Sequence, residues 1–166
     1  MQPTATAPAM DARSRALSLA AVYACIFANG VGMGLSLPLL SLVMERAGAS
    51  GSIIGLNAAF GAIAMMVATP LIPPIAGRIG ALRFLLGCYV LGAVSLLAYR
   101  ATDDIAAWFV LRFTLNCALQ GFFLVSELWI NQIATARNRG TLIGIYSALI
   151  AAGFAIGPLI IQVMGT

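Results

Sequence analysis

Long runs without a charged residue constrain this chain more than any other feature of its sequence. The first run extends from Ala16 to Met44, 29 residues, and would span about 43 Å as a helix at ~1.5 Å per residue. This run exceeds the apolar core of a signal peptide, about 7–15 residues, and is long enough for a tilted membrane span. Charged residues make up only 8% of the chain, against about 25% in soluble domains. The sequence therefore predicts an integral membrane protein.

Five apolar segments predict an all-α polytopic membrane protein with five transmembrane helices. We expect a polar tail at residues 1–15, then a bundle over 16–166 with helices at about 16–43, 52–75, 83–100, 105–133 and 141–164. The prolines Pro70, Pro73 and Pro74 are expected to kink and then end the second helix, because proline lacks a backbone donor. Residues 76–83 are expected to form the turn that follows.

The arginines predict the orientation of the bundle. The tail and the turns after the second and fourth helices hold six of them: Arg13, Arg15, Arg78, Arg83, Arg137 and Arg139. The opposite side holds only Arg46 and Arg100. Basic residues mark cytoplasmic loops, so we expect a cytoplasmic N-terminus. We expect the membrane itself to be a bacterial cytoplasmic (inner) membrane. Because the arginines are scattered, they do not form the basic patch of a nucleic-acid-binding protein, and we expect no nucleic acid as a partner.

The fourth apolar segment carries a polar stripe. Its members fall within about 100° of one another at ~100° per residue; they are Arg112, Asn116, Gln120, Glu127 and Asn131. A charge that faces lipid near the midplane costs about 2.5–3.5 kcal/mol on insertion scales. The stripe therefore needs water or polar groups beside it, which is typical of a transport pathway.

Three local patterns resemble a transporter family. Residues 30–38 (GVGMGLSLP) look like a Gly-rich segment that ends in Pro, and residues 73–80 (PPIAGRIG) are similar to the signature G-x-x-x-D-R-x-G-R-R. Residues 153–158 (GFAIGP) look like the antiporter signature G-x-x-x-G-P-x-x-G-G. Together they resemble the major facilitator superfamily, specifically its drug/proton antiporter-like branch. The chain departs from the pattern where Gly77 replaces the signature Asp, which leaves a cytoplasmic latch weakened or absent, and Asn29 stands at an acidic position of some antiporters.

The resemblance implies an N-terminal half-bundle, helices 1–5 of twelve, that works in secondary active transport by alternating access. Proton-coupled efflux is one form of that function. Its partners would be a small-molecule substrate, protons, the lipid bilayer, and a C-terminal half or another subunit that the 166 residues lack. The alternative is a non-transporting membrane scaffold or an inactive truncated half-transporter.

The candidate pathway residues lie on the first and fourth helices. Arg112 can hold an anionic group, while Asn116, Gln120 and Asn29 offer hydrogen bonds to a solute or to water. Glu127, the only acid within a span, could carry protons. The alternatives are that Arg112 snorkels to the outer interface, that Glu127 pairs with an arginine of a turn as a packing clamp, and that the amides serve packing.

Two further groups of residues are assigned from the resemblance, the gating turn with Arg78, Gly80 and Arg83, and a helix-5 bend. The bend comprises Gly153, Gly157 and Pro158, which a close helix contact with a kink would also explain.

Enzymatic chemistry is not expected, because the chain has no His and no paired-carboxylate motif or phosphate-binding loop. The cysteines Cys25, Cys88 and Cys117 lie in separate apolar runs. We therefore expect no metal site and no cofactor.

Overall fold

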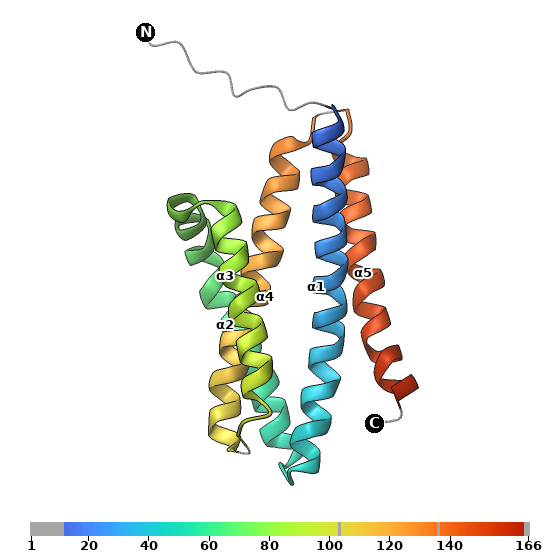
Figure 1. Cartoon of the computed structure of the whole chain (residues 1–166). Helices are drawn as coiled ribbons and strands as arrows, with labels where there is room; N and C mark the ends of the chain where they lie inside the picture. The colour runs from blue at the N-terminus through green and yellow to red at the C-terminus, as the bar shows by residue number, and fades with distance from the viewer. Residues whose placement is uncertain (1–11, 103, 136, 165–166) are drawn as a thin grey trace.

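The computed structural model describes residues 12–102, 104–135 and 137–164, and these residues form five α-helices without a strand (Figure 1). The helices are α1 (Ala12–Arg46), α2 (Gly51–Ile79), α3 (Ala81–Ala98), α4 (Ile105–Ile133) and α5 (Arg139–Met164). By length and composition, all five could cross a membrane. The predicted all-α polytopic fold is confirmed.

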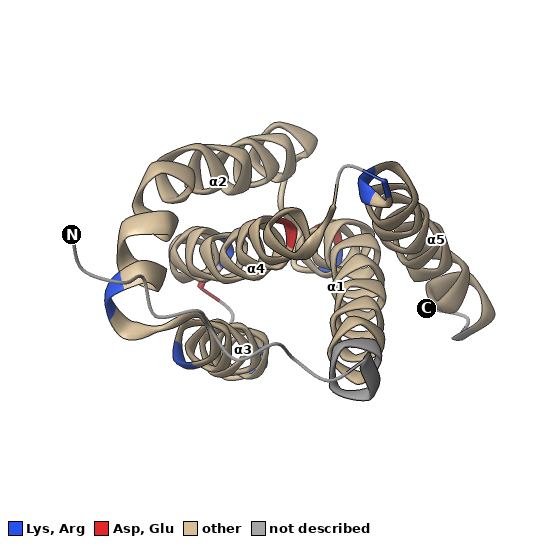
Figure 2. Ribbon diagram, turned by 90° about the horizontal axis from the view of Figure 1, so that it is seen from above, with Lys and Arg blue, Asp and Glu red and all other residues tan. Residues whose placement is uncertain are grey.

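Helix α4 lies in the middle of the bundle. Viewed from above, it is surrounded by α1, α2 and α3, while α5 lies beyond α1 (Figure 2). The helices associate in two closely packed groups, α1 with α5 and α4 with α2 and α3, and α1 touches α2 and α4 over fewer residues. A seam therefore runs between α1 on one side and α2 and α4 on the other.

Short polar or flexible residues define the helix ends that the bundle needs. Asp104 caps α4, where its side chain accepts a hydrogen bond of 3.0 Å from the Ala106 backbone N–H, and Ser50 caps α2 through Ile53. Gly80 joins α2 to α3 with φ = 90°, a conformation that glycine adopts without steric cost. Its N–H donates to the Ala76 carbonyl at 2.9 Å, so the backbone donor of the turn has a hydrogen-bond partner.

Two expectations about helix ends are wrong. Helix α2 continues through all three of its prolines to Ile79, so they do not end it, and the turn is confined to Gly80 instead of residues 76–83. Each proline removes one backbone donor, whereas leaving the helix in an apolar environment would leave every following polar group unpaired. Helices α1 and α5 also include charged residues at their ends, Arg46 and Arg139, because an uncharged run marks the apolar part of a helix and not its hydrogen-bonded limits.

Glycines bring the backbones of α1 and α5 together. The four involved are Gly30 and Gly34 in α1 and Gly153 and Gly157 in α5, all of them buried. A Cβ added at Gly157 would overlap the backbone of Gly34, and one added at Gly34 would overlap the backbone of Phe154. Small residues of this kind allow the close approach on which helix association in lipid depends. Pro158 follows Gly157 inside α5 and is exposed.

The change Gly157→Ala is expected to lower the thermal stability of the full-length protein in detergent. Overlap of the new methyl with α1 should cost about 1–3 kcal/mol, despite the higher helix propensity of alanine. Gly144→Ala is the matched control, because an added Cβ there meets nothing within 4 Å. Thermal unfolding followed by circular dichroism measures both, and equal melting temperatures would contradict the close-contact assignment.

Candidate functional site

The side chain of Arg112 is buried between three helices. Only 3% of the residue is exposed, and its Nη1 donates to the Ser36 carbonyl of α1 at 3.4 Å. Its Nε has no hydrogen-bond partner among the described residues. On the α2 side, a Cβ added at Gly61 would lie 3.0 Å from that Nε. The guanidinium therefore crosses the seam between α1 and α2, in space that a glycine leaves open.

A pocket of about 190 Å³ opens beside this guanidinium. It is lined by Met33, Ser36 and Leu37 of α1, Ala58, Ala62 and Met65 of α2, and Arg112, Asn116 and Leu119 of α4. We call it the Arg112 pocket. Asn116 is held in place by a 2.8 Å hydrogen bond from its Nδ2 to the Arg112 carbonyl. One charge and one amide thus face a small, otherwise apolar space on the seam.

Aromatic residues close the α3–α4 end of the bundle near Arg112. The Tyr99 hydroxyl donates to the Trp108 carbonyl at 3.3 Å, and the Trp108 indole donates to the Thr102 carbonyl at 2.9 Å. Burial raises the pKa of Tyr99 to about 12, an effect that the Arg112 charge opposes. The Tyr99 phenol is therefore neutral at physiological pH and does not compensate the charge of Arg112.

The remaining polar residues of α4 meet different neighbours. Gln120 Nε2 donates to Thr69 Oγ1 of α2 at 3.1 Å, next to the pocket but not in its lining. Asn131 accepts a 3.1 Å hydrogen bond from Arg139 at the start of α5. The stripe is continuous on the helix surface, yet its members contact α1, α2 and α5 separately.

Glu127 lies four helical turns from Arg112, on the part of α4 that approaches α5. It is half-buried, and it lies close enough to Tyr146 of α5 for an electrostatic interaction. No arginine side chain that the structure describes forms an ion pair with it. The two charges of α4 therefore do not share a site, and the clamp interpretation lacks an ionic partner in this part of the chain.

Asn29 lies in a different pocket from Arg112. It lines a space of about 250 Å³ between α1, α3 and α4, together with residues such as Tyr89 and Phe122. The Asn29 amide makes a long contact of 4.0 Å to the Met33 sulfur. The structure does not bring Asn29 together with Asn116, although both were predicted to face the solute.

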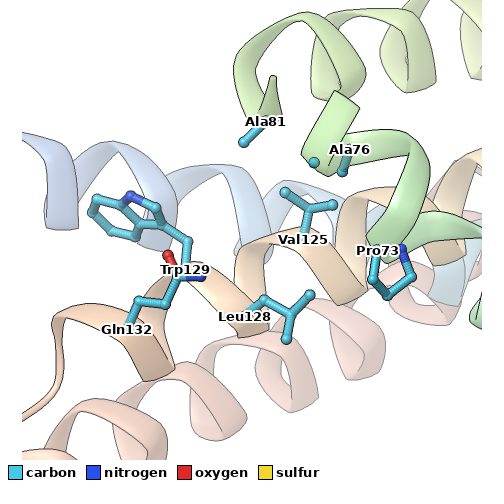
Figure 3. A pocket seen from close by; sticks show the side chains of 8 residues that line it. Pro73, Ala76, Ala81, Val125, Leu128, Trp129 and Gln132 are labelled. Atoms are coloured by element: carbon cyan, nitrogen blue, oxygen red, sulfur yellow. The ribbon is translucent and has the colours of Figure 1, made fainter. Parts of the chain in front are cut away.

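The gating-turn residues Arg78, Gly80 and Arg83 are exposed around the α2–α3 turn. Beneath the turn lies a pocket of about 270 Å³, which Figure 3 shows between Pro73 and Ala76 of α2 and Trp129 and Gln132 of α4. A larger apolar hollow of about 400 Å³ lies between α2, α3 and α4, with Arg83 as its charged member. Neither has the combination of buried charge and amide found in the Arg112 pocket.

The sequence did not identify the α2 side of the site. Asn57, Gly61 and Thr69 were recognisable only as small or polar positions of an apolar helix. Their spacing contained a usable signal, because Asn57 and Gly61 recur with Ala64 and Ala68 at helical intervals and form the buried face of α2. Among the described residues, no group of three or more His, Cys, Asp or Glu side chains could hold a metal ion.

Comparison with known proteins agrees with this architecture. The family model of the Major Facilitator Superfamily matches residues 22–166. A curated relative, "Uncharacterized MFS-type transporter YfkF" of Bacillus subtilis (strain 168), is 24% identical over 136 residues, which are 82% of this chain and 35% of the relative. The chain thus spans about a third of the length of the curated relative that it matches.

A cysteine placed in the Arg112 pocket is expected to contact water. In full-length protein whose native cysteines are replaced by alanine, Ala62→Cys should react with a membrane-impermeant maleimide, because the reactive thiolate requires an aqueous environment. Val90→Cys is the control. Val90 is 64% exposed on the membrane-spanning helix α3 and lines none of the described pockets, so we expect it to face lipid and to react slowly. Equal labelling rates at the two positions would show that the pocket is not a separate aqueous space.

Proposed function

Because the chain belongs to the Major Facilitator Superfamily, a family of transporters, we propose that it takes part in secondary transport of a small solute by alternating access. The solute would bind in the Arg112 pocket. The observation that carries this proposal is the buried guanidinium, 3% exposed, which lies with Asn116 beside an open space where three helices meet. Ionisable residues inside a membrane bundle are costly and mark substrate or ion pathways.

The position of the pocket suits this function. It lies on the seam where α1 meets α2 and α4, and these contacts are less extensive than those within each packed group. Rigid groups of helices that meet at a limited contact can shift against each other. A solute held by residues on both sides of such a seam can bias that movement, because its contacts differ between the two arrangements.

We propose that transport requires further helices, supplied by a longer chain or by another subunit. The support is that the chain spans 35% of its curated relative, and that transporter folds of this kind are built from two repeated halves. The arginine distribution supports a cytoplasmic N-terminus, and the relative from Bacillus subtilis supports a bacterial cytoplasmic membrane.

We propose more specifically that the transport is proton-coupled efflux, with Glu127 as the proton carrier. Glu127 is half-buried on α4 and has no ion pair in the described part of the chain, so its carboxyl is available to gain and lose a proton. The glycine patterns at residues 30–38 and 153–158, which resemble the antiporter branch, support the same proposal.

Replacement of Arg112 is expected to impair transport. With the full-length protein in proteoliposomes, uptake of a panel of radiolabelled small metabolites should identify a saturable solute. Loss of a hydrogen bond to a charged group costs about 1.5–3 kcal/mol, so Arg112→Gln should weaken apparent solute affinity roughly 10- to 150-fold. Arg100→Gln, at an exposed position outside the spans, is the control. Full transport by Arg112→Gln would overturn the pocket assignment, and a failure to transport any solute would favour a scaffold.

The change Glu127→Gln is expected to make transport insensitive to an imposed pH gradient, because an amide cannot cycle a proton at this position. The initial transport rate with and without the gradient measures the effect. Glu45→Gln, at an exposed carboxylate in the last turn of α1, should retain the response. An unchanged response in Glu127→Gln would remove Glu127 from the proton pathway.

A further inference from the structure

Two buried hydrogen-bond donors, one on α4 and one on α2, lack partners within the part of the chain that the structure describes. Arg112 Nε and Asn57 Nδ2 are both buried and have no partner among the described residues, and each of these residues is only 3% exposed. Asn57 lies one helical turn before Gly61, on the same buried face of α2. Arg112 Nε packs against Gly61 on this face.

The charge of Arg112 lacks a counter-ion in the described part of the chain. The acidic side chains described there, Glu45, Asp104 and Glu127, form no ion pair with it. Asp104 is occupied as the cap of α4, and Glu127 is four turns away on the same helix. A guanidinium offers only donors, and a buried cation is costly unless it is paired. The described residues therefore leave this charge uncompensated, and an anion in the pocket would compensate it.

We propose that the Arg112 pocket binds a small carboxylate anion, held by the guanidinium of Arg112. A planar carboxylate can take two parallel hydrogen bonds from one edge of a guanidinium. The guanidinium packs directly against Gly61, since a Cβ there would lie 3.0 Å from Nε, and a side chain at this position would displace it. The pocket volume of about 190 Å³ lies below the roughly 300–1,000 Å³ of sites for drug-sized ligands, and this favours a compact anion.

This inference rests on the proposed function only in equating the bound anion with the transported solute. Binding itself depends on the pocket alone, and it is therefore measured apart from transport. The remaining walls, Met33, Leu37 and Met65 among them, are apolar. They suit a carboxylate with a short hydrocarbon chain.

The test is the thermal stability of the purified full-length protein with sodium acetate or sodium butyrate, against the neutral isosteres acetamide and butyramide at constant ionic strength. The carboxylates should raise the melting temperature in a saturable manner, and the amides should not. Arg112→Gln and Gly61→Ala should each lose this shift, the first by removing the charge and the second by displacing the guanidinium. Arg100→Gln and Gly55→Ala should keep it, because Gly55 is exposed and an added Cβ there meets nothing within 4 Å.

Equal effects of carboxylates and amides on the unaltered protein would overturn the proposal, and would indicate that Arg112 has a protein carboxylate as its partner. A carboxylate shift that persists in Gly61→Ala and Arg112→Gln would also overturn it.

Should Arg112→Gln fail to fold, Arg112→Lys replaces it, because lysine keeps the charge without the planar edge. The apparent affinity of Arg112→Lys for the carboxylate should fall at least about tenfold, the fold-change of ~1.4 kcal/mol. Carboxylate binding without transport of any solute would contradict the proposed function alone, whereas transport of a neutral solute without a carboxylate shift would contradict this inference alone.

Discussion

Close approach of helix backbones at glycine is the constraint on which this bundle depends. Helices in lipid gain no hydrophobic stabilisation from one another and rely on packing of small residues. Backbones meet in this way between α1 and α5, at Gly30, Gly34, Gly153 and Gly157. At Gly61 between α2 and α4, and at Gly121 between α3 and α4, side chains of the neighbouring helix fill the space that the glycine leaves. At Gly121 an added Cβ would lie 2.7 Å from the Cys88 sulfur, so this contact also leaves no space for a side chain.

The same constraint produces the candidate site. Where Gly61 omits a side chain, Arg112 and Asn116 of α4 occupy the space, and a carbonyl of α1 accepts from the guanidinium. Packing that brings α2 close to α4 therefore also removes a cation from lipid. The hydrogen bonding of this buried region is incomplete, because Arg112 Nε and Asn57 Nδ2 have no acceptor among the described residues. That imbalance is the basis on which we propose that the pocket binds an anion.

Much of the fold was predictable from the sequence, whereas the site was predictable only in part. The five spans and the family followed from run length and local motifs, but the end of α2 did not, because proline is a weak helix terminator where no water can receive the freed backbone groups. The polar stripe of α4 was correctly placed on one face. Its division among α1, α2 and α5 was not predictable, and neither was the placement of Asn29 in a second pocket.

The sequence by itself determined that the chain spans a membrane with five helices and that α4 carries charge inside the bundle, because apolar length and helical periodicity are local properties of the chain. Only the tertiary structure decided which group each polar side chain meets. Arg112 bonds to a residue 76 positions earlier in the chain, and Gln120 to one 51 positions earlier. Such partners depend on how the backbones cross, and the crossing depends on where glycines from separate helices meet.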